Sequence, residues 1–141
     1  MLAVVKTFSL LGLESFPVQA EIDISRGLPG FNIVGLPDAA VREAGDRVKA
    51  ALRNSGFQFP VKKITVNLSP GDVKKEGPHF DLPIALGILA ASEQVNPEVL
   101  KGYSFAGELS LGGDLCSIKG VLPMALQAGQ MGLKGIFLPV M

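Results

Sequence analysis

The stretch KKEGPHFDLPIALGILAAS, residues 74–92, decides the fold of this chain. It begins as a charged loop and continues, after Asp81, into ten residues with almost no polarity. Asp81 can accept hydrogen bonds from the first amides of a helix over residues 82–93, and Pro83 is tolerated there because first-turn amides need no intrahelical partner. A helix that is apolar on all sides belongs in a core. The stretch therefore predicts a surface loop that leads directly into a central helix.

Strands are predicted on the amino-terminal side of this stretch, because apolar and polar residues alternate there. Every second residue from Val18 to Ile24 is apolar, and the residues between them are glutamine, glutamate and aspartate. This period of two is typical of a strand with one buried face, so the other face is left for water or a partner. The predicted strands on this side are residues 3–11, 18–24, 31–35 and 61–70.

A helix is predicted between the last two of these strands. Asp38 can cap its first turn, the helix continues to about Asn54, and Gly56 can end it. Its apolar residues lie on one face, and its charged residues lie on another. The charged face carries Arg42, Asp46, Lys49 and Arg53.

The spacing of these charges suggests pairs on the helix surface. Arg42 can pair with Asp46, four residues further on. Glu43 can pair with Arg47 at the same spacing. The simplest interpretation is a solvated helix face, and a docking surface is the alternative.

The carboxyl-terminal part predicts a hairpin, a helix and a final strand. A Gly112-Gly113 turn lies between two short strands within residues 104–120. The next helix must start near residues 117–120, because Pro123 has to lie in its first turn. Residues 135–140 predict a last strand. The order of elements predicts an α+β domain with helices packed on a mixed sheet.

Composition limits the classes of function. The 141 residues suit one domain, and 48% hydrophobic with 18% charged residues indicates a globular chain. A formal net charge of zero argues against bulk electrostatic coating of nucleic acid or a membrane, so any such contact must be local. The single cysteine, Cys116, excludes a disulfide framework and is expected to be a small buried residue. Residues 82–91 reach about half the length of a membrane span, which predicts a soluble, cytoplasmic protein without membrane contact.

Two segments resemble Lon-type peptidases. KKEGPHFDLPIALGILAAS is similar to the Lon nucleophile segment, and GELSLGGDLCSIKGVLPMALQAGQMGLKGIFLP, residues 107–139, is similar to the segment that bears the catalytic lysine. The resemblance places His79 where Lon has its serine and Leu122 where Lon has its lysine, with Lys119 nearby. A Ser-Lys dyad needs a hydroxyl and an amine within hydrogen-bond reach. We therefore expect no catalysis at these degenerate positions, with a divergent Lon-like serine peptidase as the alternative hypothesis.

His79 is the only histidine, and Asp81 lies two residues further on. The pair suggests a general base or a metal ligand. A zinc site would lack a second histidine or cysteine, so the simpler interpretation is a loop histidine that is hydrogen-bonded to Asp81 or to the backbone. We expect no metal site.

A longer resemblance covers the whole chain. The motifs GLPGFNIVGLPDAAVREAGDRVKAAL, ITVNLSPGDVKKEGPHFDLPIAL and FAGELSLGG are similar to the amino-terminal domain of the ComM/YifB family of magnesium chelatase-like AAA+ ATPases. This resemblance implies a ribosomal S5 domain 2-like, Lon protease-like fold for residues 1–141. It also implies an AAA+ module that follows in a longer protein, uses ATP and Mg²⁺, and is linked to DNA uptake in competence and to helicase-type remodelling of DNA in recombination.

The chain has no G-x-x-x-x-G-K-[ST] sequence, so it lacks the loop that holds nucleotide phosphates. We expect no cofactor in this chain itself. The leading hypothesis is a non-catalytic accessory domain that assists assembly or substrate engagement of a AAA+ motor. The partners that the resemblance implies are its own AAA+ module and neighbouring subunits of a ring, with DNA as a further candidate.

Four lysines form the densest positive cluster in the sequence: Lys62, Lys63, Lys74 and Lys75. They are interpreted either as a solvated strand edge and loop, or as a contact for nucleic-acid phosphates or a neighbouring subunit. The last two are expected on an exposed loop, where glutamate substitutions would leave folding intact.

Overall fold

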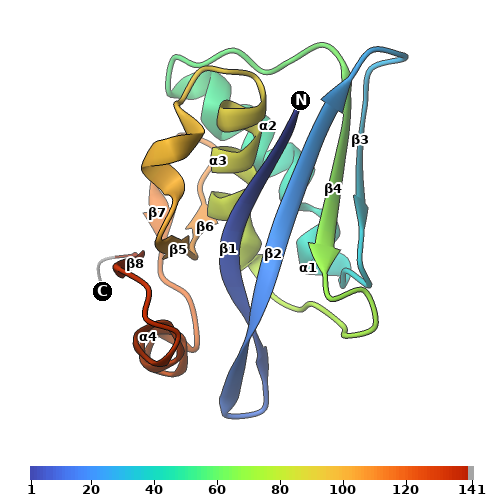
Figure 1. The fold of residues 1–141 in the computed structure, drawn as a ribbon. Coiled ribbons are helices and arrows are strands. Elements are labelled where there is room, and N and C mark those ends of the chain that lie inside the picture. Colours follow the sequence, from blue (N-terminus) through green and yellow to red (C-terminus); the bar gives the residue numbers. More distant parts are fainter. Residues whose placement is uncertain (140–141) are drawn as a thin grey trace.

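The computed structural model describes residues 1–139 and contains a six-stranded mixed sheet with helices packed on it, as the sequence predicts (Figure 1). The strands lie in the order β3-β4-β2-β1-β5-β8, so β3 and β8 form the two edges. The bounds of these strands are Leu2–Leu11 for β1, Glu14–Ser25 for β2, Gly30–Val34 for β3, Lys63–Ser69 for β4, Tyr103–Phe105 for β5 and Gly135–Phe137 for β8.

The remaining elements are four α-helices, two short 3₁₀ turns and a small hairpin. The helices are α1 (Ala39–Arg42), α2 (Ala44–Asn54), α3 (Asp81–Ala91) and α4 (Val121–Gln130). The 3₁₀ turns are η1 (Pro78–Phe80) and η2 (Pro97–Leu100), and the hairpin pairs β6 (Glu108–Leu109) with β7 (Leu115–Cys116). Within residues 1–139 no helix combines the length and apolarity that crossing a membrane requires.

The strands pair in both directions. β1 and β2 form a long antiparallel hairpin, and β4 pairs antiparallel with β2. β3 pairs parallel with β4, while β5 joins β1 and β8 joins β5 in parallel. The centre of the sheet is therefore antiparallel, and its outer strands are added in parallel.

The alternation of side chains in β1 and β2 divides the core between the two faces of the sheet. Val5 and Ile22 point to the face that α2 and α3 cover. α3 is buried almost all round, as its sequence predicts. Phe8 points to the opposite face, where it packs against Met124 and Ala128 of α4.

The polar residues of β2 remain on the open part of this opposite face. Gln19 and Asp23 are exposed, and Glu21 accepts a hydrogen bond of 2.6 Å from the amide of Asn67 in β4. The predicted polar strand face is therefore confirmed.

Several predictions about these elements differ from the structure. The helix expected from Asp38 to Asn54 is interrupted at Glu43 and forms α1 and α2. The last strand ends at Phe137, and residue 140 of its predicted range lies outside the described residues. Cys116 lies in the hairpin but is only half-buried.

Candidate functional site

The loop of residues 70–77, between β4 and η1, is attached to the segment that precedes α1. The Lys75 amide donates to the Leu36 carbonyl, and the Asp38 amide donates to the Lys75 carbonyl, each over 2.9 Å. One carboxylate oxygen of Asp38 caps α1 through the Val41 amide at 2.9 Å, and the other accepts from the Gly77 amide at 3.2 Å. Asp38 therefore caps its helix as predicted and also fixes the loop in front of α3.

His79 follows this loop and is buried, with 4% of its surface exposed. Its Nε2 lies 2.7 Å from the carbonyl oxygen of Phe8, so this nitrogen carries the proton and donates. Burial lowers the pKa of His79, and the Phe8 carbonyl and the charge of Asp38 oppose that shift only partly. His79 is therefore a neutral histidine bonded to the backbone, which is one of the two arrangements that the sequence suggests.

Gly77 shapes the space beside this imidazole. Its φ of +95° favours glycine, and a Cβ on it would lie 3.1 Å from Nδ1 of His79. The His79 carbonyl accepts from the Gly107 amide at 2.9 Å, and the Gly107 carbonyl accepts from the Leu82 amide at 3.0 Å. The loop is thereby joined to the segment between β5 and β6.

The burial of His79 predicts a pH dependence of stability. Its pKa is lowered from 6.5 in the folded protein, so the unfolded chain binds the proton more readily. The stability that the folded protein gains from keeping His79 neutral is complete above a pH of about 6.5 and is lost as the pH falls below that value.

The variant His79→Gln tests this prediction, because glutamine retains a donor for the Phe8 carbonyl but does not titrate. Urea unfolding at about pH 7.5 and about pH 5.5 should show a larger loss of the free energy of unfolding for the wild type than for this variant. Equal losses of the free energy of unfolding in the two proteins would contradict the conclusion that His79 causes the pH dependence.

Asp81 does not contact His79 by any hydrogen bond that the structure describes, and its side chain does not cap α3. Instead it forms a bidentate pair with Arg47 of α2, with 2.7 Å from Nε to Oδ2 and 3.1 Å from Nη2 to Oδ1. The Leu109 amide donates to the same carboxylate at 3.0 Å. The prediction that Asp81 caps α3 is wrong, and of the two partners considered for His79 the structure shows the backbone and not Asp81. Asp81 instead joins α2, α3 and β6.

The pKa values of both side chains are shifted in this pair. Asp81 is completely buried, and the loss of hydration raises the pKa of its carboxyl while Arg47 and the Leu109 amide act in the opposite direction. The hydrogen bond to Asp81 raises the pKa of Arg47. Glu43 lies 3.7 Å from Arg47, so the predicted surface pair is present beside the buried one.

A cleft of about 450 Å³ opens beside His79. Lys119 lines it, whereas Leu122 does not and is 68% exposed on α4. Of the two positions considered for the Lon lysine, only Lys119 therefore reaches the cleft. The full lining comprises Leu10, Asp38, Glu76, Gly77, Pro78, His79, Glu108, Ser117, Ile118 and Lys119.

Ser117 is a lining residue that the sequence analysis missed. It places a hydroxyl in the same cleft as Lys119, although no described hydrogen bond joins the two side chains. The only sequence signal was its position two residues before Lys119. The arrangement lacks the hydroxyl-to-base hydrogen bond that activates a serine nucleophile. Within residues 1–139 no group of three or more histidine, cysteine or carboxylate side chains is placed to hold a metal ion.

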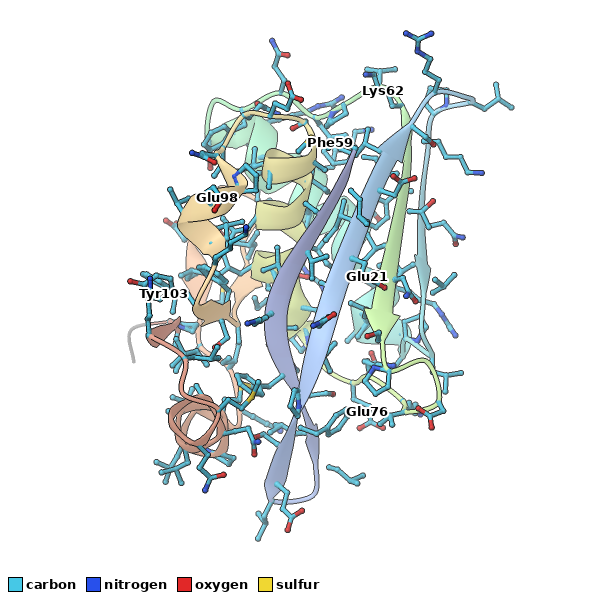
Figure 2. The ribbon with its side chains drawn as sticks, in the orientation of Figure 1. Glu21, Phe59, Lys62, Glu76, Glu98 and Tyr103 are labelled. Carbon is cyan, nitrogen blue, oxygen red and sulfur yellow. The ribbon has the colours of Figure 1, made fainter. Side chains whose placement is uncertain are left out.

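The four lysines do not form one cluster. Lys62 and Lys63 lie at the start of β4, while Lys74 and Lys75 follow its end, about 20 Å away. Figure 2 shows this separation, with Lys62 and Glu76 at opposite ends of β4. Lys74 is exposed and lies 3.7 Å from Glu76.

Lys75 is completely buried, so the prediction that it is exposed is wrong. Its ammonium donates to the Pro70 carbonyl across the base of the loop, and burial lowers its pKa. A glutamate at this position would disrupt the loop itself. Only Lys74 of this pair remains available for a partner.

Three comparisons with known proteins bear on the chain. The family model for subunit ChlI of Mg-chelatase matches residues 20–141. The uncharacterized protein YifB of Salmonella typhimurium is 49% identical over 131 residues, which are 93% of this chain and 26% of that protein. The competence protein ComM of Haemophilus influenzae is 50% identical over 127 residues, which are 90% of this chain and 25% of that protein.

Similarity to Lon peptidases is weaker. The Lon protease of Mycoplasma mobile is 25% identical over 116 residues, which are 78% of this chain and 14% of that protein. The chain thus spans about a quarter of the length of YifB and ComM.

Proposed function

Since the chain belongs to the family of magnesium chelatase ChlI subunits, in the group that contains YifB and ComM, we propose that it is a non-catalytic accessory domain of a AAA+ ATPase. In this proposal the domain lies at the amino terminus of a longer cytoplasmic protein. A motor module elsewhere in that protein binds ATP and Mg²⁺. Residues 1–141 then assist assembly of a ring or engagement of DNA during competence or recombination.

The proposed fold is the ribosomal S5 domain 2-like arrangement that Lon peptidases share. The mixed sheet and the Lon similarity over 78% of the chain support it. In this proposal His79 stands at the head of α3 in place of a nucleophile.

The buried state of His79 carries the proposal that the domain is non-catalytic. An imidazole at this place has no hydroxyl to offer, and its proton is already donated to the Phe8 carbonyl. Leu122 has no titratable group, and its side chain is directed to the surface of α4. In this proposal the cleft corresponds to the Lon peptidase site but lacks a matched nucleophile and base.

The proposed engagement of DNA is supported by the resemblance to the ComM/YifB family and by the name of ComM as a competence protein. A neutral domain gains little from bulk charge, so its contact with DNA must be local and weak. Copies gathered on a ring would bind more tightly through effective concentration.

The isolated chain is expected neither to cleave unfolded protein nor to bind ATP. The reasons are the missing hydroxyl at His79 and the absence of a phosphate-binding loop. Casein digestion and calorimetric titration with MgATP measure the two activities. Calorimetric binding of ATP at micromolar concentration would contradict the accessory role.

The alternative function is a divergent Lon-like serine peptidase, which Ser117 and Lys119 in one cleft favour. The casein assay decides between the two functions when it includes Ser117→Ala. Cleavage that is present in the wild type and absent from this variant would establish the peptidase. Cleavage that is equal in both would indicate a contaminating protease.

A further inference from the structure

A second cavity, of about 410 Å³, is separate from the His79 cleft and lies between β3, α1, α2 and the segment that precedes β4. We define it as the basic groove. Its lining comprises Pro29, Gly30, Phe31, Arg42, Gly45, Asp46, Lys49, Arg53, Phe59, Pro60, Val61 and Lys62. Phe59 and Lys62 mark this groove in Figure 2.

The basic groove concentrates positive charge in a protein whose net charge is zero. Four of its lining residues are basic (Arg42, Lys49, Arg53 and Lys62), and one, Asp46, is acidic. None of these five takes part in an ion pair within 4 Å among the described residues. The charge is therefore available to an anionic partner.

Two of the positive charges lie on the same side of α2. Lys49 and Arg53 are one turn apart on α2, about 6 Å along the axis. That separation is comparable with the spacing of neighbouring phosphates in an extended single strand. Lys62 approaches from the other wall, so an anionic chain in the groove would be contacted from both sides.

Two aromatic rings form apolar parts of the wall. Phe31 packs closely against α2 because Gly45 has no side chain, and a Cβ there would lie 2.9 Å from the ring. The ammonium of Lys49 lies 5.7 Å from the centroid of the Phe59 ring. Both rings are only partly buried. A cationic groove with aromatic walls is the pattern that binds single-stranded nucleic acid, since phosphates need the charges and bases stack on the rings.

We propose that the basic groove binds single-stranded nucleic acid, with backbone phosphates against Lys49, Arg53 and Lys62 and a base against Phe59. The inference rests on the proposed engagement of DNA and gives it a location. It also assigns the charged face of α2 to docking instead of to solvent. An acidic polypeptide would use the charges but would leave the rings without a stacking partner.

The test is fluorescence anisotropy of a labelled 15-residue oligothymidylate with the 141-residue chain at low salt. The wild type should bind at micromolar concentration. Lys49→Glu combined with Arg53→Glu should raise the Kd at least tenfold and lower the salt slope by about 1.4, or about 0.7 for each lost phosphate contact. Both residues are exposed, so thermal unfolding of the variant should match the wild type.

The matched control is Lys101→Glu combined with Lys134→Glu. It changes the net charge equally at exposed residues outside the basic groove, and its Kd should stay within about twofold of the wild type. Equal weakening by both double variants would overturn the proposal, because general charge would then explain binding. An unchanged Kd in the groove variant would overturn it as well.

Two further measurements identify the kind of molecule that binds in the basic groove. Phe59→Leu keeps an apolar side chain but removes the stacking surface, so it should weaken binding about fivefold without changing the salt slope. Polyglutamate that displaces the oligonucleotide at equal charge concentration would instead identify an acidic polypeptide and overturn the proposal. Tighter binding of a DNA duplex of the same length would also overturn the proposal.

Failure of this inference can be separated from failure of the proposed function. In the full-length protein, removal of residues 1–141 tests whether the domain contributes to DNA engagement at all. A loss of DNA binding on removal, with no effect of the groove variant, would reject the basic groove and retain the accessory role. No loss in either case would reject both the basic groove and the engagement of DNA by this domain, and would leave ring assembly as its accessory role.

Discussion

Replacing Arg47 by methionine is expected to lower the free energy of unfolding by about 3 to 5 kcal/mol. The substitution preserves most of the apolar stem but leaves the carboxylate of Asp81 without its bidentate partner. Asp81 is completely buried and cannot recover the lost interaction from water. The side chain of Arg47 is 19% exposed, which favours the lower end of that range. Urea denaturation followed by circular dichroism measures the change.

Glu43→Gln is the matched control for this prediction. Glu43 contacts the same guanidinium at 3.7 Å, but its side chain is 70% exposed, so its removal should change stability by less than about 0.5 kcal/mol. The difference between the two variants separates the buried pair from the surface pair. Similar small effects in both would mean that Asp81 is tolerated without Arg47, which its burial argues against.

Gly35→Ala is expected to destabilise the fold by about 3 kcal/mol or more. Gly35 follows β3 with a φ of +106°, a conformation that costs other residues about 1 to 3 kcal/mol. A Cβ there would also lie 2.1 Å from the carbonyl oxygen of Leu68 in β4. Because the contacted atom belongs to the backbone, relief requires movement of a paired strand, which adds a cost of about 1 to 3 kcal/mol.

Gly12→Ala separates these two contributions. Gly12 has a φ of +63° at the tip of the β1–β2 hairpin, and a Cβ on it would meet nothing within 4 Å. It should therefore show the conformational cost alone, about 1 kcal/mol. Equal thermal shifts for the two variants would show that the close approach of Gly35 to β4 is relieved without cost.

Much of the fold could be predicted from the sequence because its signals are local. The alternation in β2 and the apolar run of α3 each follow from the period of one element. The sequence also predicted the Asp38 cap and the position of Pro123 in the first turn of α4. The break at Glu43 has a weaker signal, because Gly45 two residues further on disfavours a helix interior but does not fix where the helix is interrupted.

The site depended on contacts that no local pattern contains. His79 donates to Phe8 across 71 positions, and Arg47 reaches Asp81 across 34. Sequence proximity instead suggested pairing of His79 with Asp81. It also grouped Lys62 with Lys75, although the strand between them carries their positions to opposite ends of the domain. The basic groove arises in the same way, from charges on α2 and a lysine that precedes β4.

The outer strands of the six-stranded sheet limit aggregation when many copies of the domain gather. β3 and β8, at the two edges, have only five and three residues, so each offers few free backbone groups to another chain. Pro29 immediately precedes β3, and Pro139 lies two residues beyond β8. Neither proline can donate a ladder hydrogen bond. Domains at high local concentration can therefore stand side by side without fusing their sheets into a continuous β structure.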